Sequence, residues 1–286
     1  MGMASGTNFA SYQAQSKKRK FTGGKLMKSE LSINQLFAAL GAAYLASLPL
    51  TASAVLIDGI DVGSAGNFHF AVSTIMERKV GGGIITAVGD QLEGVGQVTQ
   101  IFDGANPVWS SGDNGRELTF RFSGYTATSI SPSHITFDGG LVNFYSDTAQ
   151  DVSFGAGTGF TNGDLWMQLA GTQFTDLETG LNSTLVSDGT LLGSSISGTG
   201  IGLLSVTGAG LADSFFNTNS QHALGTSNVA DWEINSSFNN TPSPFLYGTH
   251  GTTNISQRAA VPEPASLALI GFGLIGLTAM GRKRKN

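Results

Sequence analysis

The chain has 286 residues, 40 glycines, no cysteine and a formal net charge of −5. Without cysteine it can form neither a disulfide framework nor a thiolate metal site. Residues 55–257 hold four basic residues against eighteen acidic ones, a formal charge of −14. A nucleic-acid partner requires clustered Lys and Arg, so this acidic span excludes nucleic-acid binding. Abundant glycine and sparse charge favour a β-rich protein with many turns over a helical enzyme.

The N-terminal segment predicts export. Two lysines precede an apolar stretch at 36–48, and an Ala-x-Ala sequence follows, with Ala52 and Ala54 at its two key positions. A charged region, an apolar region and a small-residue cleavage site are the parts of a secretory signal peptide. Residues 1–54 therefore predict an N-terminal extension plus a signal peptide. The Sec machinery and signal peptidase are the partners that this segment implies.

The start of translation has two candidates. Met1 gives the signal an unusually long polar extension with a basic cluster at 17–20. Met27 gives a signal of ordinary length. Both starts remain open.

Alternation of apolar and polar residues is the main structural signal in residues 55–242, the body. It is clearest at Glu117–Phe122, Asp164–Leu169 and Asp231–Asn235, where alternate residues face opposite sides of a strand. Turns rich in Asn, Asp and Gly separate these runs. Many short antiparallel strands predict an all-β fold, a single antiparallel β-sandwich or jelly-roll-like domain. Leu211–Phe216 predicts one helical turn.

The same pattern predicts two local details. The runs His134–Phe137 and Leu141–Tyr145 flank Asp138–Gly140, which predicts a hairpin turn between two strands. In the last of the alternating runs, Trp232 lies on the inward face, so its neighbours Asp231 and Glu233 are expected on the solvated face.

The body contains no recognisable catalytic constellation. It has no Gly-x-Ser-x-Gly elbow and no His-Glu-x-x-His zinc motif. Close carboxylate pairs such as Asp176 and Glu178 carry no information by their spacing, because glycosidases take their two carboxylates from distant strands. The histidines are far apart in sequence and are interpreted as strand or loop residues: His69, His134, His222 and His250. The sequence therefore predicts no enzyme, no catalytic residue, no cofactor and no metal ligand.

Calcium is the one ion left open. Oxygen-rich turns occur at 103–106, 113–115 and 162–164. None of them matches an EF-hand loop. Turn geometry alone accounts for Asn and Asp at these positions.

Trp166 is the candidate contact for a glycan. If Leu165, Met167 and Leu169 face the core, Trp166 points toward solvent, where its ring can stack on a sugar. The alternative is that Trp166 packs under a loop or against a second layer. Extracellular polysaccharide is the ligand that this hypothesis implies.

After a linker predicted at 243–260, the chain has a three-part tail. Pro262, Glu263 and Pro264 form an extended motif, because each proline fixes φ and lacks a backbone donor. The uncharged run at 267–280 is slightly shorter than the roughly 20 residues of a typical membrane-spanning helix. A basic cluster follows and acts as a cytoplasmic stop signal: Arg282, Lys283, Arg284 and Lys285.

In this order of parts, residues 261–286 resemble the PEP-CTERM sorting signal, which exosortase systems of Gram-negative bacteria recognise on exported proteins. The resemblance implies transient anchoring in the inner membrane by a transmembrane helix, and cleavage by an exosortase near the Pro-Glu-Pro motif. It also implies a role in exopolysaccharide production, biofilm or floc formation. The span at 200–240 further resembles the flocculation-associated subgroup.

Together these features predict an exported, non-enzymatic, acidic protein of the cell surface or extracellular matrix, with a structural or adhesive role. Release from the cell and covalent attachment both remain open. Two alternatives also stay open: a carbohydrate-binding module and a secreted polysaccharide hydrolase.

Overall fold

The computed structural model describes residues 54–258 except 65, 194, 223–228 and 240–248. The described residues are mostly strand, which confirms the predicted all-β, antiparallel class. A helical turn at Asp213–Phe216 confirms the prediction at 211–216. The elements in chain order are β1 (Leu56–Ile57), β2 (Ile60–Asp61), β3 (Asn67–Lys79), β4 (Gln91–Asp103), β5 (Asn106–Ser110), η1 (Asp113–Gly115), β6 (Glu117–Ile130), β7 (His134–Asp147), β8 (Asp164–Gly171), β9 (Phe174–Thr175), β10 (Asn182–Ser183), β11 (Leu185–Thr190), β12 (Ser197–Val206), α2 (Asp213–Phe216), β13 (Gln221–His222), β14 (Val229–Ala230), β15 (Trp232–Asn239) and β16 (Thr249–Arg258).

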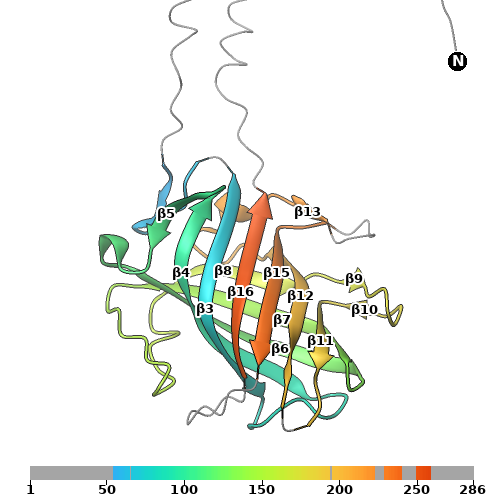
Figure 1. The fold of residues 1–286 in the computed structure, drawn as a ribbon. Helices are drawn as coiled ribbons and strands as arrows, with labels where there is room; N and C mark the ends of the chain where they lie inside the picture. Colours follow the sequence, from blue (N-terminus) through green and yellow to red (C-terminus); the bar gives the residue numbers. More distant parts are fainter. Residues whose placement is uncertain (1–53, 65, 194, 223–228, 240–248, 259–286) are drawn as a thin grey trace, which may run out of the picture. The chain divides into compact units, whose positions relative to one another are not determined.

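One large antiparallel sheet contains most of these strands, in the order β11-β12-β15-β16-β3-β4-β6-β7-β8, with β5 beside β4. Further pairings of β11 with β7 and of β12 with β8 join its two ends, so the sheet closes on itself. Figure 1 shows one layer made of β12, β15, β16, β3 and β4, and a second layer of β6, β7 and β8 that crosses behind it. The sandwich-like pair of layers is therefore one continuous sheet.

Aromatic side chains fill the space between the layers. The Phe70 ring centroid lies 4.7 Å from that of Trp232 and 6.1 Å from that of Trp166. Phe216 from α2 contacts both tryptophans and is fully buried. Edge-to-face and tilted ring pairs of this kind add about 0.5–1.5 kcal/mol each beyond the burial of their area. The inward face predicted for Trp232 is confirmed.

The hairpin turn predicted at Asp138–Gly140 is wrong. Residues 134–147 form one long strand, β7, which pairs with β6 on both sides of the two glycines. Gly139 and Gly140 have φ values of 79° and 97°, in the left-handed region that favours glycine. They bend the strand without ending it, and β7 pairs with β11 before the bend and with β8 after it.

The linker predicted at 243–260 is wrong for the stretch at Thr249–Arg258. This stretch forms β16, which pairs with β15 on one side and β3 on the other. Its position in the middle of the sheet order makes it part of the body. The composition of this stretch does not reveal that its backbone groups pair with strands on both sides.

The predicted signal peptide up to residue 53 and the tail at 261–286 lie outside the described residues. Within the part of the chain that the structure describes, no helix is long and apolar enough to cross a membrane.

Two glycines in β4 leave room for aromatic rings of the neighbouring strand. Gly94 is paired with Phe122 and Gly96 with Phe120. A Cβ atom added at Gly96 would lie 2.3 Å from Cζ of Phe120, and one at Gly94 would lie 2.3 Å from Cζ of Phe122. The rings therefore lie over the glycines. The packing of this part of the core requires that positions 94 and 96 have no side chain.

We predict that Gly96→Ala destabilises the protein by about 1–3 kcal/mol, because the added methyl group forces a core ring out of position. The free energy of unfolding from urea titration measures the effect. Ser73→Ala on the exposed side of β3 is the control and should change that free energy by less than about 0.5 kcal/mol. Equal effects of the two substitutions would contradict the packing argument.

Candidate functional site

Trp166 is not exposed, so the prediction that it faces solvent is wrong. Its side chain is fully buried against Phe70 and Phe216, and its Nε1–H donates to the carbonyl oxygen of Ile57 over 3.1 Å. A register shift places Phe144 opposite Met167 and Tyr145 opposite Leu165, so Trp166 has no pairing partner on β7. Such an irregularity interrupts strict alternation, and Trp166 joins the core instead of the outer face.

Asp231, expected on the solvated face, is also buried. It is 1% exposed, and its carboxylate accepts backbone N–H bonds from Val206, Thr218 and Asn219 over 2.6–2.8 Å. Asp213 does the same for Gln168, Gly208 and Gly210. Buried carboxylates that accept several backbone N–H bonds hold the backbone in place. These two groups fix the loops around α2, and with them the position of Phe216.

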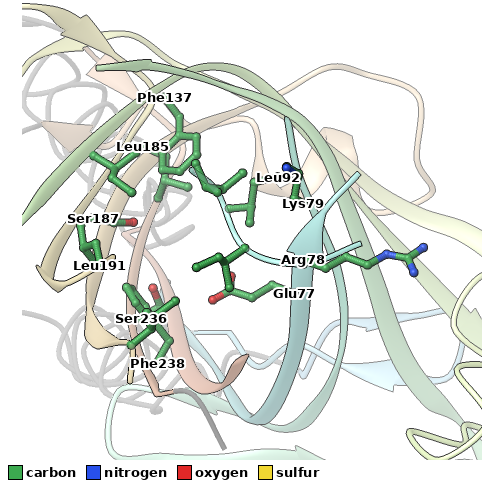
Figure 2. Close-up of a pocket in the computed structure, with 15 residues that line it drawn as sticks. Glu77, Arg78, Lys79, Leu92, Phe137, Leu185, Ser187, Leu191, Ser236 and Phe238 are labelled. Atoms are coloured by element: carbon green, nitrogen blue, oxygen red, sulfur yellow. The ribbon is translucent and has the colours of Figure 1, made fainter. Parts of the chain in front are cut away.

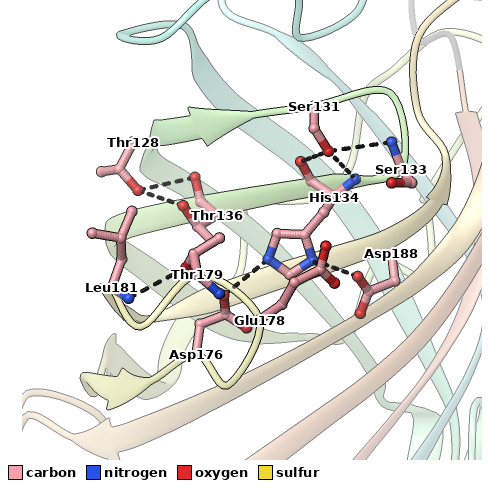
Figure 3. A network of polar contacts seen from close by, with 10 residues as sticks. All are labelled: Thr128, Ser131, Ser133, His134, Thr136, Asp176, Glu178, Thr179, Leu181 and Asp188. Atoms are coloured by element: carbon pink, nitrogen blue, oxygen red, sulfur yellow. Dashed lines mark hydrogen bonds and ion pairs between the residues drawn. The ribbon is translucent and has the colours of Figure 1, made fainter.

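The most concentrated polar chemistry in the described residues surrounds His134, at the start of β7. Figure 3 shows its imidazole ring between carboxylates from two other segments. Nδ1 lies 2.5 Å from Oδ1 of Asp188 in β11 and 3.3 Å from Oε2 of Glu178, and Nε2 lies 3.0 Å from Oδ2 of Asp176. His134 and Asp176 are buried, whereas the side chains of Glu178 and Asp188 are 64% and 52% exposed. The ring therefore presents one nitrogen inward and one toward the surface.

Electrostatics favour the charged form of this histidine. Burial alone would lower the pKa of His134, but hydrogen bonds to Asp188 and Asp176 outweigh it and raise the pKa above its ordinary value of 6.5. For Asp176, burial acts to raise the pKa, but hydrogen bonds from the side chain and backbone of Thr179, together with the charge of His134, hold it below its usual value. The carboxylates around His134 thus favour the protonated form of this buried ring.

The sequence did not identify this cluster. In the sequence, Asp176 and Glu178 are a close carboxylate pair, and His134 is an isolated histidine. They meet because the segment between β9 and β10 lies beside the junction of β7 and β11, which are paired through Asp188 and His134. No spacing rule predicts this contact, since 42 residues separate His134 from Asp176.

A second group of possible metal ligands consists of Glu117, Asp147 and Asp151. Burial raises the pKa of Glu117, the nearby charges of Asp151 and Asp147 add to the effect, and N–H bonds from the backbone oppose it. The turns considered for calcium do not contribute to either group that the described residues form. Asp113 accepts a backbone N–H bond from Ser110 nearby in the chain, whereas Asp103 accepts one from Ser64, which is distant in sequence.

An apolar cavity lies inside one end of the closed sheet. Its volume is about 80 Å³, and it is partly open to solvent. Figure 2 shows Leu92, Phe137 and Leu185 around a common space that Glu77 also lines, whereas Arg78 points away from it. An apolar lining with a few polar groups is typical of small-molecule sites. Trp166 does not line it.

We predict that Trp166→Ala acts on stability and lowers the free energy of unfolding by about 3–5 kcal/mol, because it leaves a large cavity in the core. Urea titration followed by circular dichroism measures the loss. Leu177→Ala is the control, since Leu177 is 80% exposed. A Trp166→Ala protein as stable as the wild type would contradict the burial.

We predict that the ion pairs of His134 stabilise the fold at acidic pH and lose this effect as pH rises. The pKa of His134 is raised in the folded state, so its contribution is complete below the unfolded value of about 6.5 and is lost as pH rises through the folded value. The measurement is the difference in unfolding free energy between wild type and His134→Gln, in EDTA, from about pH 5.5 to 8.5. A difference that grows with pH would contradict the assignment.

The comparison with protein families finds the PEP-CTERM protein-sorting motif at residues 260–285. No curated protein and no solved structure matches the chain. The family match confirms the resemblance of the tail, whereas membership of the flocculation subgroup stays a prediction. The motif implies a secreted protein that is sorted by an exosortase. The chain therefore carries a PEP-CTERM protein-sorting motif at residues 260–285.

Proposed function

We propose that this chain is an exported substrate of an exosortase, and that its body serves as non-enzymatic structural or adhesive material in biofilm, exopolysaccharide or floc formation. The PEP-CTERM motif at residues 260–285 carries the proposal. The signal peptide delivers the chain to the Sec machinery, and signal peptidase cuts after Ala54. The tail helix anchors it transiently in the inner membrane before the exosortase acts near Pro262-Glu263-Pro264.

The chemistry of the body supports a structural role. Its formal charge of −14 over residues 55–257 keeps it soluble and limits self-association outside the cell. Asp213 and Asp231 are occupied in holding backbone N–H groups. The burial of Trp166 removes the residue on which the carbohydrate-binding alternative depended. Extracellular polysaccharide remains the proposed partner through surfaces other than Trp166.

Mass spectrometry of the mature C-terminus tests the sorting step. The wild-type protein should lack the basic cluster Arg282–Lys285, and a triple alanine variant of Pro262, Glu263 and Pro264 should retain it. Pro242→Ala/Pro244→Ala is the matched control, because it removes another Pro-x-Pro sequence outside the motif. The control should be processed like the wild type. An intact basic cluster on the wild-type mature protein would refute the proposal.

Floc and biofilm mass test the role of the body. Deletion of the gene should reduce the mass, and the wild-type chain should restore it. The triple alanine variant should fail to restore it because the body does not reach its destination. Unchanged mass after deletion would contradict the adhesive role and leave the sorting result unaffected.

A further inference from the structure

We propose that His134, Glu178 and Asp188 form a binding site for a divalent transition-metal ion, with Zn²⁺ as the representative. The site lies where the start of β7, the segment between β9 and β10, and β11 meet (Figure 3). It goes beyond sorting and matrix function and does not depend on either.

The three ligand atoms already lie close together. Nδ1 of His134 and one carboxylate oxygen each of Glu178 and Asp188 lie within 4.8 Å of one another. Around Zn²⁺, bond lengths of about 2.0–2.2 Å place ligand atoms roughly 3.3–3.6 Å apart. The 3.3 Å between Nδ1 and Oε2 of Glu178 meets this condition. The 2.5 Å between Nδ1 and Oδ1 of Asp188 must widen by about 1 Å, and the half-exposed Asp188 side chain has room to move.

The ligand types select the class of ion. An imidazole nitrogen with two carboxylates suits Zn²⁺ and similar first-row metals, whereas Ca²⁺ and Mg²⁺ prefer oxygen ligands alone. Three protein ligands leave a fourth position for water on the exposed side, where Glu178 and Asp188 reach solvent.

Asp176 supplies the outer support that metal-binding histidines require. Its Oδ2 lies 3.0 Å from Nε2 of His134 on the side of the ring away from Glu178 and Asp188. Asp176 is itself held by the backbone N–H and the hydroxyl of Thr179, over 2.8 Å and 2.5 Å. A carboxylate that accepts the Nε2 proton fixes the ring orientation and directs the Nδ1 lone pair at the metal. Because His134 and Asp176 are both buried, the ring cannot easily turn away.

Charge balance also favours a cation here. Asp176, Glu178 and Asp188 bring three carboxylates to one imidazole. In the described part of the chain, the ion pairs of Arg and Lys involve Asp58, Asp90 and Glu93, none of which belongs to this cluster. A divalent ion replaces the Nδ1 proton and compensates the excess negative charge. It would also tie three segments together, so it should stabilise the fold by linkage.

Calorimetric titration of ZnCl₂ into the full-length protein, purified without a polyhistidine tag, tests the site. We expect one saturable ion per chain and a rise in melting temperature on binding. Glu178→Gln and Asp188→Asn should each weaken binding by about tenfold or more, since each removes a charged ligand. Both residues are exposed, so these variants should remain folded, which circular dichroism verifies.

Asp147→Asn is the matched control, because it removes one charge from the other carboxylate group and leaves the His134 cluster intact. It should bind Zn²⁺ within about twofold of the wild type, a change well below 1 kcal/mol. His134→Gln should abolish saturable binding if the variant folds. If it does not fold, the Glu178→Gln and Asp188→Asn variants alone test the site. Absence of saturable binding would overturn the proposal. Equal weakening by Asp147→Asn and Asp188→Asn would also overturn it, because Zn²⁺ would then be attracted only loosely to an acidic surface.

Discussion

Closure of the sheet depends on the bend of β7 at Gly139 and Gly140. Because their positive φ values bend the strand without breaking its pairing to β6, β7 pairs with β11 on one side of the bend and with β8 on the other. Both β8 and β11 then pair with β12, so the ladder closes. A closed ladder leaves fewer unpaired backbone edges, which invite aggregation when they are exposed.

The interior that this closure creates is held in two ways. Rings of Phe70, Trp166, Phe216 and Trp232 pack against one another at its centre. Asp213 and Asp231 then satisfy the backbone N–H groups of the loops beside α2. In a protein without cysteine, these buried carboxylates fix loops that disulfides often fix in other secreted domains. Asp213 and Asp231 therefore have a structural role beside the core.

The cluster around His134 lies at the pairing of β7 with β11, which also closes the sheet. β7 and β11 meet before the bend, so His134 and Asp188 are paired across the ladder, and the segment carrying Asp176 and Glu178 covers them. Fold and candidate metal site therefore have one origin. A metal ion bound here would reinforce the part of the sheet where β7 changes its partner strand.

The sequence by itself determined the PEP-CTERM tail and the all-β class, because a linear motif and the alternation of residues such as Leu118 and Phe120 are local properties of the chain. Tertiary structure alone decided the inward turn of Trp166, the burial of Asp231 and the strand at Thr249–Arg258, each of which depends on a register or a partner strand distant in sequence. The cluster of His134 with Asp176, Glu178 and Asp188 was likewise decided by tertiary structure alone. Its ligand atoms come from three segments, and only the closed sheet brings them within a few ångströms.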